Sequence, residues 1–337
     1  MNGSWIVVKA SYGIFDPSCL AWQQAPIPGV PHGRVLVRTL LLSVDPTTRN
    51  WLKLNPRMQF IPFGVGDPVI GVGIGVVEES RAAGFEPGML VTGCWGWQRH
   101  SLADPGYLEV LQPDERIPLE ARLSVFSHVG RAAVMGLVGV ANTQPGETVL
   151  VSGAAGATGS LAAAIAKSMG CRTVGVAGGP AKCRWLRDEL QLDAVIDYRA
   201  GSLVEAVANA CPEGVDVYFD NVGGELLDAV LLNMAIGCRI VVCGMISQYD
   251  LQDASRAHGV LNLPMMIFRR ARMEGFVVPQ FQPRYSEFDA ILRRLYFAGK
   301  LPVRAHVIEG LENAPEAVTL LFDGSNDGKL MVRVSEV

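Results

Sequence analysis

Short apolar runs alternate with longer amphipathic segments through the second half of the chain. Strands of a parallel sheet are buried on both faces and therefore appear as continuous apolar runs, while the helices between them show a helical period. The alternation predicts βαβ units and an α/β fold with a doubly wound parallel sheet. The predicted strands cover residues 148–152, 172–177, 194–197, 215–220 and 239–243.

Helices are predicted between and around these strands. Residues 160–169 are rich in alanine, which has the highest helix propensity, so they are expected to form the crossover between the first two strands. A glycine- and alanine-rich helix is expected from about Phe126, and an amphipathic helix after Glu287. A final short strand, residues 329–334, is expected to return to the first domain.

The N-terminal third of the chain follows a different pattern. Short β-rich pieces, including residues 34–38 and 70–77, are separated by turns that contain glycine and proline, which is typical of an irregular β-domain. The length of 337 residues also favours two domains rather than one. We expect a β-domain at residues 1–122, completed by about residues 300–337, and an α/β domain at residues 123–299.

Composition narrows the class of protein. Hydrophobic residues make up 49% of the chain and charged residues 18%, which supplies a large core and argues against disorder. The net charge of −4 gives no general attraction for nucleic acid or an anionic membrane, so neither is expected as a partner. No apolar run reaches the roughly 18 residues that span a bilayer, and the first residues do not resemble a signal peptide. The seven cysteines form no CxxC pair, so we expect reduced thiols and a cytoplasmic protein.

Three regularly spaced glycines, Gly153, Gly156 and Gly159, stand between the first predicted strand and its helix. The spacing differs from GxGxxG, but the second glycine still lets a diphosphate approach the backbone, and the third lets helix and strand pack closely. The free N–H groups at the start of the helix, together with its dipole, form an anion site. The segment is therefore predicted to bind a dinucleotide.

The residues after the second strand indicate which dinucleotide binds. An NAD site usually carries an Asp or Glu roughly 20 residues after the glycines, where it accepts from the ribose hydroxyl. Residues 174–182 contain no carboxylate, and the first charged side chain is Lys182. A cation at this point suits a 2′-phosphate, so the sequence favours NADP.

No metal site and no catalytic nucleophile are expected. Cys19 and Cys94 are isolated, and the five histidines are scattered without a partner at metal-ligand spacing. The chain has no G-x-S-x-G motif, and Ser152 belongs to the phosphate-binding turn instead. Hydride transfer without a metal is the chemistry that this pattern predicts.

Several sequence blocks together resemble one protein family. They are SVDPTTR (43–49), SGAAGATGS (152–160), DVYFDNVGGELLD (216–228), CGMISQY (243–249), EGFVV (274–278) and SNDGKLMV (325–332). From about residue 34 to its C-terminus, the chain resembles the zinc-free prostaglandin reductases, also called alkenal double-bond reductases, of the medium-chain dehydrogenase/reductase superfamily. The resemblance implies a GroES-like β-domain and a Rossmann domain, a homodimer, and the use of NADPH to saturate the C=C bond of α,β-unsaturated ketones or aldehydes.

The same resemblance implies which residues hold the cofactor. Its diphosphate would lie on the glycine bend, its 2′-phosphate on Lys182 and Tyr198, and its remaining parts along the later blocks. The full set is Gly156, Ala157, Thr158, Gly159, Lys182, Tyr198, Asn221, Cys243, Gly244, Met245, Ile246, Ser247, Tyr249, Phe276, Val277, Val278 and Asn326.

Tyr249 is also the candidate catalytic residue. Hydride would reach the β-carbon of an enone while hydrogen-bond donors hold the developing enolate oxygen. A phenol stays protonated at neutral pH and can donate without ionising. The alternative that Tyr249 only orders the cofactor loop stays open. Tyr249 and Thr47 are the predicted substrate-side residues.

The chain departs from the family pattern at two positions. Thr47 replaces a tyrosine after SVDP, and Val134 falls in a block where the family carries aromatic residues. Both changes remove aromatic bulk near the substrate or cofactor, so the preference for prostaglandins does not transfer. Three tryptophans could line an apolar pocket or belong to the core: Trp51, Trp95 and Trp97. A quinone oxidoreductase and a non-catalytic NADP-binding protein remain alternatives.

Overall fold

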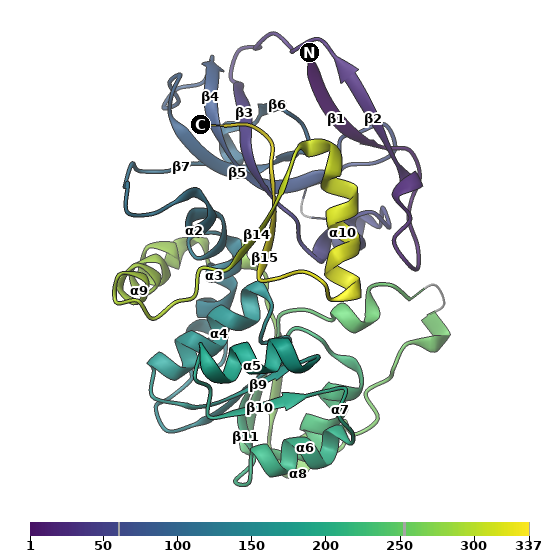
Figure 1. The fold of residues 1–337 in the computed structure, drawn as a ribbon, viewed down its shortest axis with the longest axis vertical. Helices are drawn as coiled ribbons and strands as arrows, with labels where there is room; N and C mark the ends of the chain where they lie inside the picture. The colour runs from purple at the N-terminus through teal and green to yellow at the C-terminus, as the bar shows by residue number, and fades with distance from the viewer. Residues whose placement is uncertain (60, 252–253, 337) are drawn as a thin grey trace. The chain divides into compact units, whose positions relative to one another are not determined.

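The computed structural model describes residues 1–59, 61–251 and 254–336, and its ribbon is drawn in Figure 1. The chain divides into two compact units, each made of separate stretches of sequence. The first unit contains Met1–Leu123, Tyr249–Gln252 and Ala305–Val337, and the second contains Ser124–Gln248 and Asp253–Arg304.

The second unit is built on a parallel sheet, as the sequence predicted, and its strands follow the order β10-β9-β8-β11-β12-β13. The order reverses direction between β8 and β11, which is the topological switch point of a doubly wound sheet. Its strands are β8 (Thr148–Val151), β9 (Arg172–Ala177), β10 (Ala194–Asp197), β11 (Val215–Asp220), β12 (Met234–Val242) and β13 (Arg272–Gly275).

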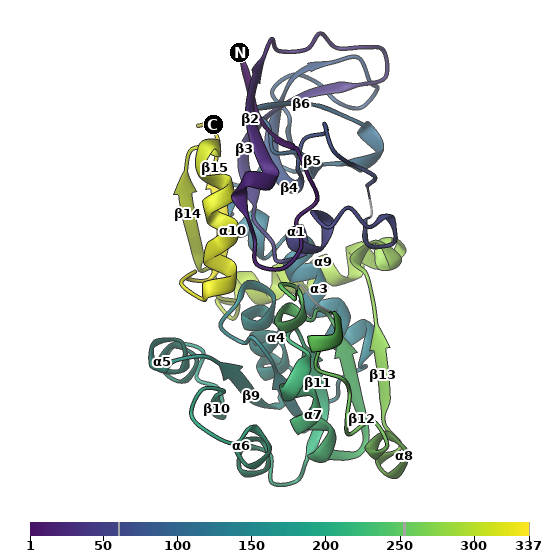
Figure 2. The same cartoon turned by 90° about the vertical axis from the view of Figure 1, so that its right-hand side faces the viewer.

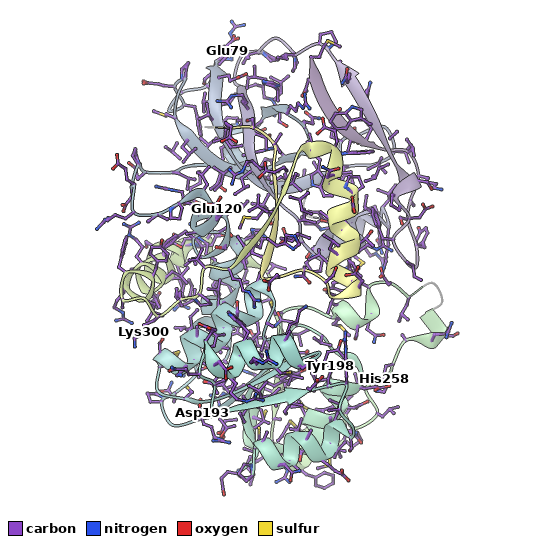
Figure 3. All side chains as sticks on the ribbon, in the orientation of Figure 1. Glu79, Glu120, Asp193, Tyr198, His258 and Lys300 are labelled. Atoms are coloured by element: carbon purple, nitrogen blue, oxygen red, sulfur yellow. The ribbon has the colours of Figure 1, made fainter. Side chains whose placement is uncertain are left out.

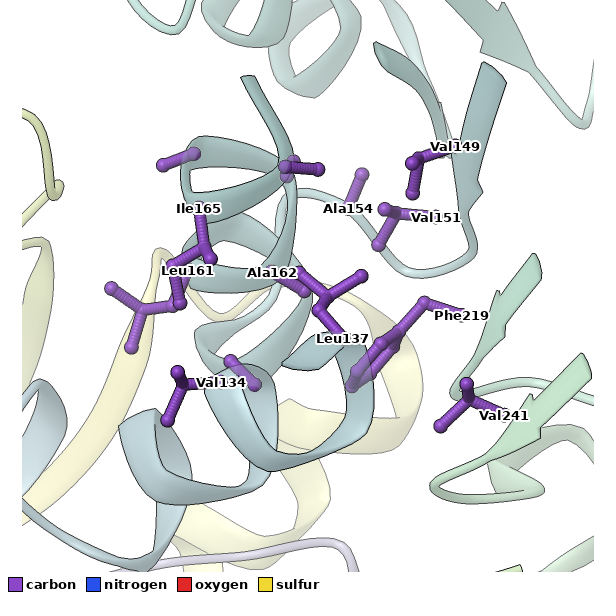
Figure 4. Packing of buried hydrophobic residues seen from close by; sticks show 14 of the residues in the cluster. Val134, Leu137, Val149, Val151, Ala154, Leu161, Ala162, Ile165, Phe219 and Val241 are labelled. Carbon is purple, nitrogen blue, oxygen red and sulfur yellow. The ribbon is translucent and has the colours of Figure 1, made fainter. Parts of the chain in front are cut away.

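Helices cover both faces of this sheet, because side chains of successive strand residues point to opposite faces. Val149 and Val151 pack in one apolar cluster with α3, α4 and α9, as Figure 4 shows, whereas Leu150 packs in another cluster with α6 and α7. The helices are α3 (His128–Val134), α4 (Ala157–Ser168), α5 (Pro180–Asp188), α6 (Leu203–Ala210), α7 (Gly224–Leu232), α8 (Met265–Arg269) and α9 (Tyr285–Phe297). Shorter helical turns are the π-helical η4 (Met135–Val140) and the 3₁₀ turns η5 (Ile246–Gln248), η6 (Ala254–Arg256) and η7 (Val278–Arg284).

Several element boundaries in this unit differ from the sequence prediction. The first strand ends at Val151 instead of residue 152, because the glycine bend starts at Ser152. Helix α4 begins at Ala157, three residues earlier than predicted, because the bend itself delivers the chain into the helix. Strand β12 starts at Met234, because its N-terminal part pairs with the start of β11 through an irregular register. Strand β13 was not predicted.

The first unit carries an antiparallel sheet, with one parallel pair at its end, in the order β14-β15-β3-β4-β5-β7, and β6 pairs with β3. These strands are β3 (Val35–Ser43), β4 (Ile70–Ser80), β5 (Leu90–Gly96), β6 (His100–Ala103), β7 (Leu108–Val110), β14 (Ala305–Glu309) and β15 (Lys329–Arg333). The predicted return of the C-terminal strand is confirmed, because β15 pairs antiparallel with β3. Strands β1 (Asn2–Val7) and β2 (Leu20–Ala25) form a separate antiparallel pair, visible in Figure 2.

Short helices complete the first unit. They are α1 (Thr47–Trp51), α2 (Leu119–Ser124) and α10 (Ala314–Asp323), with 3₁₀ turns η1 (Pro17–Cys19), η2 (Pro56–Met58), η3 (Pro105–Tyr107) and η8 (Leu311–Asn313). Helix α10 buries Ala317 and Val318 in a cluster that also holds Leu42 of β3 and Trp97. The C-terminal segment therefore contributes both a strand and part of the core to this unit.

Candidate functional site

The glycine bend joins β8 to α4 by a close approach of two backbone segments. Gly153 has a φ of 58°, in the left-handed region where a side chain is disfavoured. A Cβ on Gly159 would overlap the carbonyl of Gly153 and the Cα of Ala154. The first turn of α4 can therefore lie directly on the bend only because residue 159 is glycine.

The N-terminus of α4 has the features of an anion site. Gly156 is the N-cap, and among the described residues it has no side chain that caps the first N–H groups of the helix. Those N–H groups point toward the bend and carry the positive end of the helix dipole. Gly156, Ala157, Thr158 and Gly159 thus stand together in one turn that fits a diphosphate.

A buried polar network fastens the bend to the end of β11. Ser152 Oγ donates to Asp220 Oδ1 at 3.0 Å, and the phenol of Tyr218 donates to the same oxygen at 2.8 Å. The backbone N–H groups of Val222 and Gly223 also donate to it, at 2.9 and 2.8 Å. Burial raises the pKa of Asp220, although these hydrogen bonds oppose the shift. The sequence analysis did not single out Asp220, although it stands within the DNVGG block.

Asn221 lies beside the bend. Its side chain donates to the carbonyl of Ser152 at 2.7 Å, and its backbone N–H donates to Ser152 Oγ at 2.7 Å. The carbonyl of Asp220 accepts from the N–H groups of Cys243 and Gly244. The structure therefore brings the bend, Asn221 and the start of the 243–247 loop together at the carboxyl ends of neighbouring strands, where ligands of such sheets bind.

The rest of this loop is held by the turn after β11. The N–H of Ile246 donates to the carbonyl of Asn221 at 3.1 Å, and the N–H of Ser247 donates to that of Val222 at 3.2 Å. Ser247 Oγ adds a hydrogen bond to the same carbonyl at 2.6 Å. Met245 lies against Gly223, where a Cβ would stand 3.2 Å from its terminal methyl group. The predicted loop residues 243–247 thus form one ordered turn.

The predicted 2′-phosphate residues stand at the carboxyl ends of β9 and β10, which are adjacent strands. Tyr198, labelled in Figure 3, lies with its ring against Gly178 so closely that a Cβ there would stand 2.6 Å from a ring carbon. Asp197 Oδ1 accepts from the N–H groups of Gly179 and Arg199 at 3.1 and 3.0 Å. These two hydrogen bonds lower the pKa of the Asp197 carboxyl. Lys182 lies in the first turn of α5, which starts after Gly179.

Arg199 is a candidate that the sequence analysis missed. Its guanidinium lies 5.5 Å from the ring centroid of Tyr198, and one of its nitrogens would stand 3.7 Å from a Cβ on Gly179. The position therefore supplies a second cation near the turn that follows β9. The signal was present in the sequence, because Arg199 directly follows Tyr198.

A cavity of about 350 Å³ opens beside Tyr198 within the second unit. On its wall, His258 Nε2 lies 2.6 Å from Asp228 Oδ2, and the N–H of Asn262 donates to the other carboxylate oxygen at 2.9 Å. Burial opposes ionisation of Asp228, but these hydrogen bonds outweigh it and lower its pKa. The carboxylate thereby fastens the 258–262 segment to α7.

Residues 276–278, which follow β13, pack only in part against the rest of the second unit. Phe276 contacts Phe281 edge to face, with ring centroids 6.2 Å apart, and Val278 packs on the large cluster of the second unit. Val277 is 42% exposed. Their predicted role behind the nicotinamide stays a prediction.

Three predicted site residues belong to the first unit: Thr47, Tyr249 and Asn326. Thr47 opens helix α1, and Asn326 follows α10, where its amide donates to the carbonyl of Gly328 at 3.1 Å. Tyr249 is half-buried and directly follows the loop of the second unit. Their contacts with a cofactor or substrate remain predictions.

Two sequence blocks of the first unit, residues 43–49 and 325–332, meet through an ion pair. Lys329 Nζ lies 2.9 Å from Asp45 Oδ1 and also donates to the carbonyl of Val44 at 3.0 Å. Ser43 Oγ donates to the second oxygen of Asp45 at 2.5 Å. The SVDP segment and the tail strand are thereby joined by a lysine that is itself buried.

Some candidate residues lie in the hydrophobic core. Trp95 is 4% exposed and donates through its indole N–H to Thr39 Oγ1 at 3.0 Å, and Trp97 is fully buried. Val134 is also fully buried, in the cluster drawn in Figure 4. Its expected place at the border of the substrate or cofactor is therefore wrong, because helix α3 turns this side chain into the core. Trp51 is only half-buried.

The part of the chain that the structure describes holds no metal centre and no disulfide bond. Within the described residues, no group of three or more His, Cys, Asp or Glu side chains could hold a metal ion. Over the same residues, all seven cysteines are free thiols, and no helix has the length and apolar character needed to cross a bilayer.

Comparisons with known proteins identify the family. Residues 4–111 match the model of the N-terminal domain of oxidoreductases, and residues 157–295 match that of zinc-binding dehydrogenases. The putative NADP-dependent oxidoreductase YfmJ of Bacillus subtilis is 38% identical, with 94% of this chain and 92% of that protein covered. The NADP-dependent 2-alkenal reductase of Nicotiana tabacum is also 38% identical, with 91% and 89% covered.

A solved structure is also similar to this chain over nearly its whole length. CurA from Vibrio vulnificus, in complex with NADPH, is 32% identical, covers 99% of this chain and 100% of its own, and has a TM-score of 0.92. The chain belongs to the medium-chain dehydrogenase/reductase superfamily, in its zinc-free branch of enone double-bond reductases. The predicted family and the predicted GroES-like and Rossmann fold class are confirmed.

Proposed function

We propose that this protein uses NADPH to reduce the C=C bond of α,β-unsaturated ketones or aldehydes. One observation carries the proposal: in a member of the enone reductase branch, the glycine bend presents the N-terminus of α4 as an anion site at the switch point of the sheet. The alkenal reductase and the NADPH-bound CurA structure among its relatives support the same chemistry.

The described residues fit NADPH. The bend offers uncapped helix N–H groups to the diphosphate, and the close approach of its two backbone segments leaves no room for a side chain at Gly159. Lys182, Tyr198 and Arg199 would hold the 2′-phosphate, and Asn221 with the 243–247 loop would border the ribose and nicotinamide. When bound, NADPH supplies the hydride. Phe276, Val277, Val278 and Asn326 complete the proposed set.

Tyr249 would act on the substrate. Its phenol donates a hydrogen bond to the carbonyl oxygen, on which negative charge develops as the β-carbon receives hydride. A proton from water then adds to the α-carbon, so that the C=C bond becomes a single bond. Donors aimed at such an oxygen contribute roughly 10²-fold or more to turnover. Thr47 is proposed to contact the substrate on the same side.

The direct test is NADPH consumption by the purified protein with a matched panel of enones, enals and quinones. We expect turnover with enones and enals, and the saturated carbonyl product by mass spectrometry. Turnover with quinones alone would favour a quinone oxidoreductase. NADPH binding without turnover of any compound would favour a non-catalytic NADP-binding protein.

The assignment of NADP has its own test. Lys182→Glu places a negative charge near the proposed 2′-phosphate site, so the Kd of NADPH should rise by about 100-fold, with little change for NADH. Lys300→Glu, at an exposed position after α9, makes the same change in net charge and should leave both constants unaltered. Equal weakening of NADPH and NADH by Lys182→Glu would contradict the assignment.

The role of Tyr249 is tested by Tyr249→Phe. Loss of the hydroxyl should lower kcat on an enone by about 100-fold and leave the Kd of NADPH within about twofold. Unchanged kcat would mean that Tyr249 only orders the loop.

Domain roles, assembly and compartment complete the proposal. The substrate domain is proposed at residues 1–122 and about 300–337, and the NADP-binding domain at 123–299.

A homodimer is supported by β13 at the sheet edge and by Ile267 and Phe268 of α8, which are 76% and 73% exposed. Phe268→Asp should then yield a monomer in light scattering. A cytoplasmic location is supported by the free thiols, which a reducing compartment preserves.

A further inference from the structure

Arg49 is a buried charged residue of helix α1, and it is held by two other segments, residues 11–15 and Asp250. Its Nε donates to Asp250 Oδ1 at 2.8 Å, and its side chain is 0% exposed. Its Nη2 donates to the carbonyl of Gly13, and its Nη1 lies 3.5 Å from Ser11 Oγ. The guanidinium also lies 5.6 Å from the ring centroid of Phe15. All of these residues belong to the first unit.

Asp250 is the carboxylate that the structure pairs with this cation. A charge removed from water is costly unless an opposite charge and hydrogen bonds compensate it. Lys53 lies close enough to respond to both charges: burial and the charge of Arg49 lower the pKa of its ammonium, and the charge of Asp250 raises it. The attraction therefore draws Asp250 toward α1, across a separation of 201 residues in sequence.

Tyr249 is thereby held next to α1. Asp250, the residue that follows it, is fixed by Arg49, and neighbouring Cα atoms are only about 3.8 Å apart. The backbone at Tyr249 consequently has little freedom to move away from this attachment.

We infer that Arg49 is a positioning residue for the reaction, and that its ion pair with Asp250 sets the place of the Tyr249 hydroxyl. The inference rests on the proposed function, in which that hydroxyl donates to the substrate oxygen. A misplacement of about 1 Å can cost 10²-fold in rate. The charge pair would thus act on the reaction through Tyr249.

The test is Asp250→Asn, which keeps the shape of the side chain and removes its charge. We expect kcat on an enone to fall about tenfold, with the Kd of NADPH, measured by fluorescence, within about twofold of wild type. Amide hydrogen exchange in a peptide covering residues 246–250 should become faster. Asp250→Glu keeps the negative charge and should restore kcat to within about threefold of wild type.

A matched control is Glu120→Gln. Its carboxylate pairs with Arg333 at 2.8 Å and is 27% exposed, against 26% for Asp250. The same chemical change there should alter neither kcat nor exchange at residues 246–250. An equal effect in both variants would show a general loss of stability and would overturn the inference.

A double-mutant cycle decides whether Asp250 acts through Tyr249. In a Tyr249→Phe background, Asp250→Asn should lower kcat by less than about twofold further, because the hydroxyl that it positions is already gone. An undiminished tenfold loss there, or unchanged kcat in Asp250→Asn alone, would overturn the inference. Absence of enone turnover in the wild type would instead refute the proposed function, and the two failures are therefore distinguishable.

Discussion

The nucleotide side of the second unit consists of the glycine bend with Lys182, Tyr198 and Arg199. It and the surroundings of Arg49 in the first unit depend on different kinds of interaction. The glycine bend depends on residues that have no side chain, since Gly153 and Gly159 let two backbone segments meet and leave the helix N–H groups accessible. Around Arg49, the structure depends on charged side chains that compensate one another inside the protein. A backbone site tolerates no added atoms, whereas a charge-pair site tolerates changes in shape better than changes in charge.

The largest expected effect comes from adding one methyl group to the backbone site. In Gly159→Ala the new Cβ would overlap Gly153, so α4 must shift away from the bend. We expect the Kd of NADPH to rise by at least about 100-fold and the free energy of unfolding to fall by about 3 kcal/mol. Isothermal titration and denaturant unfolding measure the two quantities. Gly29→Ala, with no described atom within 4 Å of the new Cβ, is the control and should change neither.

A smaller effect is expected from the charged part of the nucleotide side. Arg199→Ala removes a cation but leaves the bend intact, so the Kd of NADPH should rise by about tenfold and that of NADH by less than twofold. Arg187→Ala, on the exposed surface of α5, provides the control. A loss as large as that of Gly159→Ala would contradict the view that backbone geometry dominates this side.

The smallest effect concerns one thiol in each unit and depends on pH. Burial raises the pKa of Cys94 in the first unit and of Cys238 in the second to about 12, from an ordinary value of 9.0. The stabilisation by the protonated thiol is therefore complete below pH 9 and is lost as the pH rises toward 12. Within this window, each thiol lowers the free energy of unfolding by about 1.4 kcal/mol per pH unit.

Single variants can assign this loss to a unit. Cys94→Ala and Cys238→Ala should each make the fall in Tm between pH 9 and 10.5 shallower than in the wild type. If the units unfold separately, each variant should change only one transition in calorimetry. Identical slopes in the variants and the wild type would contradict the raised pKa values.

The contrast between a local backbone site and a charge pair of distant residues also explains what could be predicted from the sequence. The parallel sheet and the bend follow from local signals, because glycine spacing, apolar runs and helix propensity act within a few tens of residues. Lys182 was likewise found through its position after β9. The family resemblance then added Tyr198, Tyr249 and the 243–247 loop, which no local pattern indicates.

The features that could not be predicted from the sequence depend on contacts between distant segments of the chain. Nothing near Arg49 in sequence shows that its partner is Asp250, and nothing near Asp45 points to Lys329. The buried place of Val134 depends on how α3 packs against α4, which the helical pattern alone does not give. Arg199 was overlooked although it directly follows Tyr198, because its nearness to Gly179 follows from the turn geometry.

The C-terminal strand β15 also constrains the order in which the protein can mature on the ribosome. Its hydrogen bonds join β14 to β3, so the sheet of the first unit lacks an internal member until residues 329–333 have been translated. The second unit ends at Arg304. The nucleotide-binding half can therefore finish folding while the N-terminal half, although synthesised first, still waits for its closing strand.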